Sequence, residues 1–296
     1  MNRSINCIDR EGNMVDAYTV PTGVYRLLYN CAAGRLIIRG MIRPRISGTV
    51  GYFLNKRFSR VLIRPFIRKC RIDMSEYETE KYRSFNEFFR RKILPGMRPV
   101  NNAPGSIVSP CDGKVQIYTI DENTNFEIKN VSYTMEKLLR NAELAGRYRG
   151  GVLMRFHLGV NDYHHYAYPV DGTEGNRVRL KGILHTVNPA APAKKPIYSE
   201  NAREYTILDV PGMGKVLMME VGALMVGKIV NIHPAGPVRR GEEKGYFEFG
   251  ASSIILCFEK GAIIPDRDIA ENTEKGYETL VKLGERIGRS GTAGAC

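Results

Sequence analysis

Residues 245–261 read Gly245-Tyr-Phe-Glu-Phe-Gly-Ala-Ser-Ser-Ile-Ile-Leu-Cys-Phe-Glu-Lys-Gly261, a stretch that joins a small-residue turn to an apolar run. The run after the turn is rich in branched and aromatic residues, which predicts a buried β-strand. Two serines, Ser252 and Ser253, stand at the junction. Taken alone, glycine and small polar residues before a strand are typical of an ordinary turn.

The hydroxyl of Ser252 is placed to attack its own backbone. If its Oγ adds to the carbonyl carbon of Ala251, an ester replaces the amide, and elimination can then leave a pyruvoyl group on the new N-terminus. Small residues before the serine and a rigid strand after it suit the uncommon backbone geometry that this reaction needs. A pyruvoyl group is a covalently attached electron sink.

Other segments repeat the motif order of one enzyme family, and the sequence resembles the phosphatidylserine decarboxylases over roughly residues 80 to 261. Their joint order is more specific than any one of them. The matching segments are Tyr82-Arg-Ser-Phe-Asn-Glu-Phe-Phe-Arg-Arg-Lys-Ile-Leu-Pro-Gly-Met-Arg-Pro99, Ser109-Pro-Cys-Asp-Gly-Lys-Val115, Asp162-Tyr-His164, Val187-Asn-Pro189, Val221-Gly-Ala-Leu-Met-Val-Gly227 and the turn from Phe249 to Ser253.

The resemblance implies a proenzyme that cuts itself between Ala251 and Ser252. The products are a β chain of residues 1–251 and an α chain of residues 252–296, which carries the pyruvoyl group derived from Ser252. Such an enzyme is a carboxy-lyase that converts phosphatidylserine to phosphatidylethanolamine and CO₂. We expect the two chains to stay associated, because the strand after Ser252 is too apolar to leave the core.

Asp112 lies in Ser109-Pro-Cys-Asp-Gly-Lys-Val115, a turn that enters a strand. An aspartate before glycine commonly caps its own turn, which is the structural alternative. The resemblance instead implies that Asp112 belongs to the self-cleavage triad, in which it orients a histidine that deprotonates the serine.

The histidine motif departs from the family pattern Asp-Tyr-His-Arg-x-His-x-Pro. Here the segment reads Asp162-Tyr-His-His-Tyr-Ala-Tyr-Pro169, so the first histidine is kept as His164 and the second falls at Ala167. A methyl group cannot accept a proton. We expect His164 to position the substrate carboxylate, to deliver a proton in decarboxylation or to serve as the base.

Three explanations account for the missing histidine. His164 or His165 takes over as base, His185 or His233 reaches the serine, or self-processing is lost. In an extended segment, side chains two residues apart point to the same face, so His165 would share a face with position 167. His165 is therefore a candidate substitute base. His157 is expected to be a packed residue without a chemical role.

The cleavage junction also departs from the family, which has Gly-Ser-Thr where this chain has Ala251-Ser252-Ser253. If the residue before the cut has a positive φ, alanine costs about 1 kcal/mol relative to glycine. This would slow the reaction without preventing it.

The positive charge is concentrated near the N-terminus. The net charge is +13, and the segment between Ala17 and Ile72 contains basic residues but no acidic ones. Apolar residues interleave with them at helical spacing, which suits peripheral binding to an anionic phospholipid surface. No uncharged run approaches the roughly 20 residues that span a bilayer. The basic residues are Arg26, Arg35, Arg39, Arg43, Arg45, Lys56, Arg57, Arg60, Arg64, Arg68, Lys69 and Arg71.

Two other interpretations of this region remain open. The apolar faces of its helices can join the core while the basic faces are solvated. Nucleic-acid binding is disfavoured, because no recognised binding motif accompanies the charge. We therefore expect a peripheral protein on the cytoplasmic face of the cell membrane, with phosphatidylserine as its substrate and no nucleic-acid partner. Whether the protein forms a homodimer is left open by the sequence.

The pattern of hydrophobic residues predicts an α+β fold with a helical N-terminal layer and a mostly antiparallel β core. We expect residues 1–99 to form the basic amphipathic helical region and residues 100–296 the catalytic core. Residues 135–145 are expected to form an inserted helix. The expected strands are Ile107-Val108, Lys114 to Ile120, Gly151 to His157, Val178 to Leu184, Tyr205 to Val210, Val216 to Val221 and Ser253 to Phe258.

The scattered cysteines and histidines indicate a reduced setting and no metal site, because no CxxC pair or zinc-ligand spacing is present. Two other functions fit the same sequence. One is a decarboxylase of another amino-acid headgroup or of a soluble amine. The other is a membrane-binding relative that no longer processes itself, as the change at Ala167 would permit.

Overall fold

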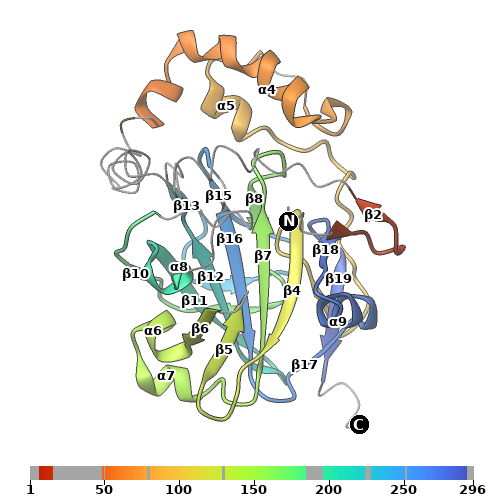
Figure 1. The fold of residues 1–296 in the computed structure, drawn as a ribbon, viewed down its shortest axis with the longest axis vertical. Helices are drawn as coiled ribbons and strands as arrows, with labels where there is room; N and C mark the ends of the chain where they lie inside the picture. Colours follow the sequence, from red (N-terminus) through yellow and green to blue (C-terminus); the bar gives the residue numbers. More distant parts are fainter. Residues whose placement is uncertain are drawn as a thin grey trace.

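A large β-sheet forms the centre of the protein (Figure 1). The computed structural model describes residues 7–15, 49, 51–78, 81–128, 131–184, 196–223, 228–250 and 252–291. Within these ranges eleven strands join one sheet, in the order β14-β9-β11-β12-β16-β7-β4-β18-β1-β2 with β10 on β11. All its pairs are antiparallel except β1 with β18.

The bounds of this sheet follow the apolar runs of the sequence. Its strands are β1 (Cys7–Ile8), β2 (Met14–Val15), β4 (Gly113–Thr119), β7 (Val152–Leu158), β9 (Gly172–Glu174), β10 (Val178–Leu180), β11 (Arg203–Val210), β12 (Gly214–Val221), β14 (Gly236–Val238), β16 (Ser252–Phe258) and β18 (Glu278–Val281).

Strand β16 lies at the middle of the sheet, between β12 and β7. All seven of its residues are buried, which confirms the strand predicted from the apolar run. Its register places Ser252 opposite Leu158 and Ser253 opposite His157 on β7. The first residue of this central strand is therefore the candidate nucleophile.

Smaller sheets surround the central one. One contains β8 (His165–Ala167), β13 (Ile229–Asn231) and β15 (Glu243–Phe247). A second contains β3 (Ser106–Val108), β17 (Ile263–Pro265) and β19 (Arg286–Ser290), and β5 (Asn125–Ile128) pairs with β6 (Val131–Thr134). The pairing of β8 with β15 brings the histidine motif beside the chain that leads into the serine turn.

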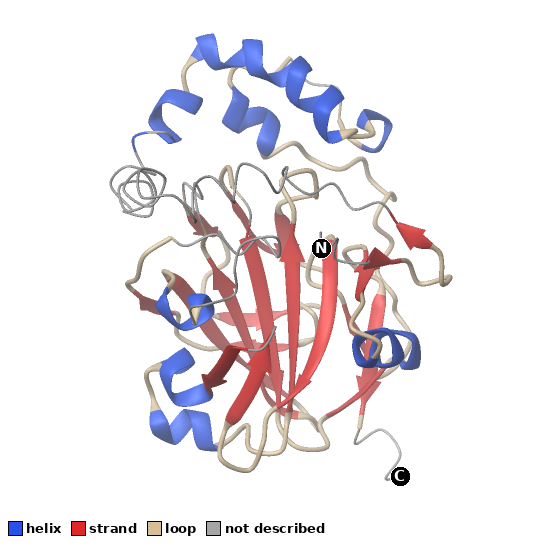
Figure 2. Cartoon of the chain, viewed as in Figure 1, coloured by secondary structure: helices blue, strands red, loops and turns tan. Residues whose placement is uncertain are grey.

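Short helices lie together over one end of the sheet (Figures 1 and 2). Residues 51–54 are helical, and the 3₁₀ helix η1 (Arg57–Leu62), helix α4 (Ile63–Cys70), 3₁₀ helix η2 (Met74–Glu76) and helix α5 (Phe85–Phe89) follow. Ser84 caps α5 by accepting a hydrogen bond from Glu87 N.

An aromatic cluster joins these helices to the serine turn. The ring of Phe85 lies 5.1 Å from Phe66 of α4 and 5.2 Å from Phe249, between ring centroids. Phe89 lies 5.1 Å from Phe249. The apolar face of α4 thus joins a core, as one of the two interpretations of the basic region expected, while Phe58 and Val61 of η1 remain exposed.

The α+β class and the antiparallel core are confirmed, whereas two local expectations were wrong. The helix expected over residues 135–145 is two short helices, α6 (Met135–Leu139) and α7 (Ala142–Gly146), because Arg140 adopts a left-handed conformation and Asn141 caps a new helix. The strand expected from Val178 to Leu184 ends at Leu180 as β10. The remaining helices are α8 (Ile197–Glu200) and α9 (Arg267–Glu274).

Much of the predicted basic helical region, residues 16–48, lies outside the described residues. In the part of the chain that is described, no helix is both long and apolar enough to cross a membrane.

We expect Phe85→Ala to lower the free energy of unfolding by about 3–5 kcal/mol, because it removes a buried ring that contacts both Phe66 and Phe249. Phe53→Ala is the matched control: this ring is 52% exposed, and its loss should change stability by about 0.5 kcal/mol or less. Urea unfolding followed by circular dichroism measures both. Equal effects of the two substitutions would contradict the packing described.

Candidate active site

Ser252 is fully buried at the start of β16. Its Oγ has no hydrogen-bond partner among the described residues, and the same is true of Ser253 Oγ. A buried hydroxyl without a partner is costly, and such groups often mark reactive positions. Successive strand residues point to opposite faces, so the two hydroxyls face different surroundings.

The turn before Ser252 needs glycine at position 250. Gly250 has a φ of 138°, a conformation that residues with side chains rarely adopt. Ala251 lies outside the described residues, so the predicted cost of alanine at that position stays a prediction.

His164 contacts this turn directly. Its Nε2 lies 3.1 Å from the Gly250 carbonyl oxygen and its Nδ1 lies 2.9 Å from the Asp162 carbonyl oxygen. The imidazole is fully buried, and its ring centroid lies 4.2 Å from that of Phe89. The structure therefore brings His164 and the serine turn together.

Burial lowers the pKa of His164 to about 3, and the positive charge of Arg91 adds to the decrease. The ring is thus neutral near pH 7 and carries one N–H. It can donate to only one of its two carbonyl neighbours, and the other nitrogen keeps a lone pair that can accept a proton.

A buried ion pair supports the segment that carries His164. Lys114 Nζ lies 2.7 Å from Asp162 Oδ2, and the same oxygen accepts a hydrogen bond from Gly159 N at 2.7 Å. Burial alone would raise the pKa of Asp162, but the ammonium group of Lys114 and these hydrogen bonds hold it below its usual range. The carboxylate therefore stays charged and fixes the turn before His164.

Asp112 lies on the loop before β4 and is held by an arginine. Arg98 donates to both carboxylate oxygens, through Nε to Oδ1 at 2.9 Å and through Nη2 to Oδ2 at 2.7 Å, and Leu283 N donates to Oδ1 at 2.8 Å. Among the described residues no histidine ring is hydrogen-bonded to Asp112. Its implied role as orienter of a histidine stays a prediction.

His165 points away from the serine turn. Its Nδ1 lies 2.6 Å from Glu243 Oε1, and its Nε2 lies 3.1 Å from the Arg90 carbonyl oxygen. Strand β8 is extended, so His165 does share a face with the buried Ala167, as the parity argument expected. Both ring nitrogens are nevertheless occupied by groups outside the turn.

The other histidines are placed as follows. His185 lies outside the described residues. His233 contacts Glu242 Oε1 at 3.1 Å and the Pro234 carbonyl oxygen at 2.7 Å, so its ring is held by its own loop. His157 is buried opposite Ser253, with its Nδ1 4.0 Å from Glu278 Oε2.

Sequence reasoning missed the residues that support the site. Phe89, Arg98 and Lys114 all lie inside the family-like segments, yet only the fold assigns them contacts with His164, Asp112 and Asp162. Their positions within those family-like segments were the only indication in the sequence that these residues support the site. Within the described ranges, no group of three or more histidine, cysteine or acidic side chains is arranged to hold a metal ion.

We expect Asp162→Asn to lower the free energy of unfolding by about 3–5 kcal/mol, because it leaves the ammonium group of Lys114 buried without its counter-charge. The exposed pair of Lys215 and Asp209 has the same 2.7 Å separation, so Asp209→Asn is a matched control with an expected cost of about 0.5 kcal/mol or less. Chemical denaturation at pH 7 measures both.

The pH dependence gives a second check on this pair. Because the folded-state pKa of Asp162 is below its ordinary value of 3.8, the pair stabilises the protein fully above that value. The stabilisation is lost as the pH falls through the lowered pKa. A difference between Asp162→Asn and the parent protein that grew on acidification would contradict the assignment.

The chain matches the family model described as phosphatidylserine decarboxylase over residues 85–289. It is 42% identical to phosphatidylserine decarboxylase proenzyme 2 of Clostridium acetobutylicum over 269 residues, which cover 90% of this chain and 92% of the relative. The phosphatidylserine decarboxylase proenzyme of Clostridium novyi is 37% identical over 96% of this chain and 99% of its own length, and that of Fusobacterium nucleatum is 36% identical over 96% and 97%. The chain belongs to the phosphatidylserine decarboxylase family.

Proposed function

We propose that this protein is a phosphatidylserine decarboxylase proenzyme that cuts itself between Ala251 and Ser252 and converts phosphatidylserine to phosphatidylethanolamine and CO₂. The observation that carries the proposal is the buried Oγ of Ser252, which has no hydrogen-bond partner among the described residues. It follows a turn whose Gly250 carbonyl contacts His164. Family membership supports the same reaction class.

In the proposed cleavage, Ser252 Oγ adds to the Ala251 carbonyl carbon and the amide becomes an ester. The hydroxyl proton must leave as this bond forms, and a general base must accept it. We assign this role to His164, because its ring contacts the Gly250 carbonyl oxygen in the turn before Ser252. Loss of the α-proton of residue 252 then releases the Ala251 carboxylate. Addition of water and loss of ammonia leave a pyruvoyl group at the new N-terminus of the α chain.

The surroundings of Ser252 suit a covalent pyruvoyl group. The residue is buried, small neighbours precede it, and its oxygen makes no hydrogen bond to a described residue. The pyruvoyl group would supply the electron sink for loss of CO₂ from the amine-bearing substrate. His164 would return the proton to the α-carbon of the substrate or hold its carboxylate.

The two chains are proposed to stay together after cleavage. Strand β16 would form the start of the α chain, and it pairs on both sides with strands of the β chain, β12 and β7. Burial of all seven of its residues opposes separation. A homodimer stays a prediction.

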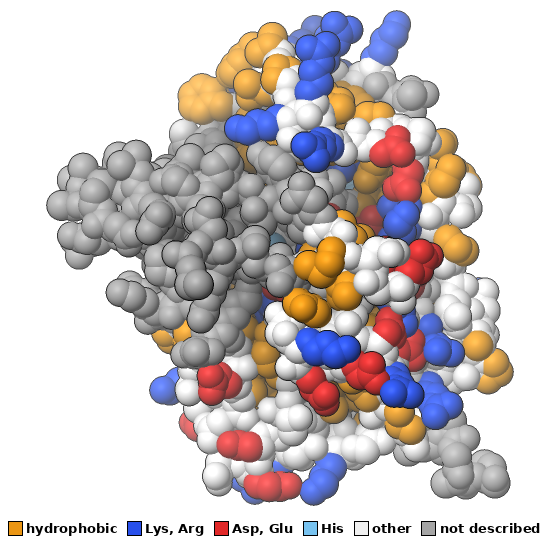
Figure 3. All heavy atoms as spheres, turned by 45° about the vertical axis from the view of Figure 1, so that its right-hand side comes forward, with side chains coloured by type: hydrophobic (Ala, Val, Ile, Leu, Met, Phe, Trp, Pro, Cys, Tyr) orange, Lys and Arg blue, Asp and Glu red, His pale blue; other side chains and the backbone are white. Residues whose placement is uncertain are grey.

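A peripheral position on the cytoplasmic face of the cell membrane is also proposed. Figure 3 shows hydrophobic and basic side chains gathered at the helical end of the molecule. There the rings of Tyr52, Phe53 and Phe58 are 59%, 52% and 62% exposed. Each basic residue near anionic headgroups contributes about 1 kcal/mol. The exposed basic side chains of residues 51–72 are Lys56, Arg57, Arg60, Arg64, Arg68, Lys69 and Arg71.

Denatured intact-mass analysis tests the self-cleavage. We expect the purified protein to separate into residues 1–251 and 252–296, with no free amino group at the start of the smaller chain. Ser252→Ala should remain one chain of 33.3 kDa and lack decarboxylase activity. Ser253→Ala, the matched control one residue further, should still be cut at the same bond. A single uncut parent chain would contradict the proposal.

The assignment of the base is tested by comparing neighbouring histidines. We expect His164→Ala to slow self-cleavage by about 100-fold or more, the usual contribution of a general base. His165→Ala should retain most of the parent rate, because its ring is held by Glu243 and Arg90. Gel analysis of timed samples after synthesis in vitro measures both rates. The reverse order would assign the base to His165.

A further inference from the structure

A cavity of about 450 Å³ lies where strands β10 and β11 of the central sheet meet the start of β13. Three small residues, Gly182, Ala202 and Gly222, line it together with longer side chains from these strands. Its volume lies within the roughly 300–1,000 Å³ of pockets that hold small molecules. The cavity is therefore large enough for a substrate headgroup.

The cavity belongs to the same part of the sheet as the candidate nucleophile. A row of paired residues crosses the strands β10, β11, β12 and β16, and its members are Leu180, Arg203, Val221 and Ser253. The next row, one residue further along each strand, consists of Lys181, Ala202, Gly222 and Ser252. Residues of one row lie on the same face of a sheet. Because the first three members of the second row line the cavity, the cavity leads along this face toward Ser252.

The two residues between Lys181 and Ser252 in this row are small. Neighbouring strands are about 4.8 Å apart, so three steps separate Lys181 from Ser252 by roughly 14 Å. Gly222 N donates to the Ala202 carbonyl oxygen at 2.9 Å, which holds these two positions side by side. A Cβ at Gly222 would lie only 3.3 Å from Leu184 Cδ2, another lining group. A larger residue at position 222 would therefore crowd the cavity.

The lining has an excess of positive charge. Among its described residues four are basic and one, Glu204, is acidic. Glu204 Oε1 already pairs with Arg179 at 2.7 Å. Arg203 is buried and donates to three backbone carbonyl oxygens. Lys181 and Lys228 are exposed and form no ion pair within the described ranges, so two ammonium groups remain for an anion.

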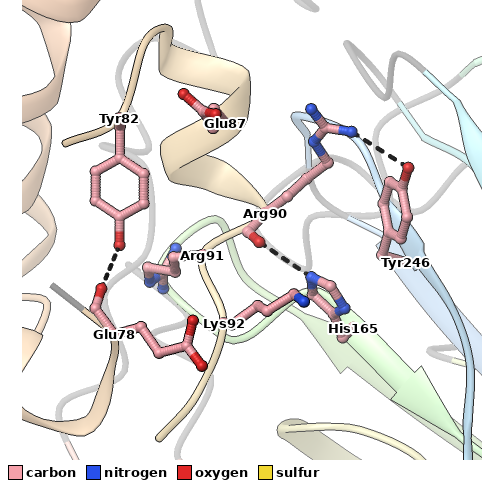
Figure 4. Close-up of a pocket in the computed structure, with 8 residues that line it drawn as sticks. All are labelled: Glu78, Tyr82, Glu87, Arg90, Arg91, Lys92, His165 and Tyr246. Carbon is pink, nitrogen blue, oxygen red and sulfur yellow. Dashed lines mark hydrogen bonds between the residues drawn. The ribbon is translucent and has the colours of Figure 1, made fainter. Parts of the chain in front are cut away.

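The cavity at the end of α5 is a weaker candidate for a substrate site (Figure 4). Its volume is about 220 Å³, and no residue of β12 or β16 lines it. Its polar groups also contact one another. Arg90 Nη1 donates to Tyr246 Oη at 3.2 Å, and His165 Nε2 lies 3.1 Å from the Arg90 carbonyl oxygen.

We propose that the cavity beside β10 binds the headgroup of the substrate, a phosphodiester that carries an amino acid, with Lys181 and Lys228 facing its phosphate. An ammonium group binds phosphate as a compact point charge. With the phosphate held there, the amino acid extends over Ala202 and Gly222 toward Ser252. This inference rests on the proposed function, because it takes residue 252 as the reaction centre.

A lipid headgroup, rather than free phosphate, is the proposed source of the phosphate. Figure 1 shows β13 at the end of the β core that lies toward the helical layer. That layer is the part of the molecule proposed to face the membrane. A lipid held at the membrane can therefore reach the cavity with its headgroup.

Isothermal titration calorimetry of the full-length Ser252→Ala chain with glycerophosphoserine tests the proposal. This probe is the headgroup without its acyl chains. We expect it to bind, and Lys181→Glu or Lys228→Glu to weaken its binding about tenfold through loss of one charge-assisted contact. Lys260→Glu makes the same charge change on a side chain that is 73% exposed and does not line the cavity, and it should leave binding unchanged.

Ala202→Leu tests the steric part of the proposal. It changes no charge but adds bulk to the row between Lys181 and Ser252, so it should also weaken binding. Circular dichroism shows whether this variant is folded. If it is not, the two lysine variants keep the test decisive, because both side chains are exposed.

Inorganic phosphate is the second probe and distinguishes the two sources. Weaker binding of inorganic phosphate than of glycerophosphoserine supports a headgroup site, whereas equal or tighter binding would identify free phosphate and overturn the proposal. No binding of glycerophosphoserine, or equal weakening by Lys228→Glu and Lys260→Glu, would also overturn it. The Ser252→Ala chain separates binding from self-cleavage, so headgroup binding together with an uncut parent chain would contradict only the proposed function.

Discussion

The complete burial of strand β16 is the constraint on which the rest of the structure depends. An antiparallel strand with neighbours on both sides satisfies its backbone hydrogen bonds through β12 and β7, and its apolar side chains anchor it in the core. The residue that begins this strand is Ser252. Ser252 is thereby held at the end of a buried strand, and both products of the proposed cut before it would remain packed.

The aromatic cluster extends this constraint to the helical layer. Phe249, just before the serine turn, packs on Phe85 and Phe89 of α5, and Phe89 also packs on the ring of His164. The same short helix therefore supports both the turn and the histidine. The helical layer, which carries the surface proposed to contact lipid, is thereby joined to the candidate active site through packed rings.

Charges within the site are controlled by burial and pairing together. Lys114 keeps Asp162 ionised, Arg98 binds Asp112 through two donors, and burial beside Arg91 keeps His164 neutral. A neutral imidazole between two carbonyl groups can exchange a proton, whereas a permanently charged one could not act as a base. Burial and the neighbouring charge of Arg91 thus determine the protonation state of His164.

The sequence by itself determined the α+β class, the buried strand after Ser252 and the family, because hydrophobic periodicity and motif order are properties of the chain alone. The local backbone conformation was harder to predict from the sequence. The left-handed conformation of Arg140 divides one expected helix into two. Only the tertiary structure decided that His164, rather than His165, faces the serine turn, and that Arg98 is the partner of Asp112. These contacts join residues far apart in the chain, and side-chain parity within a single strand cannot specify which distant groups meet it.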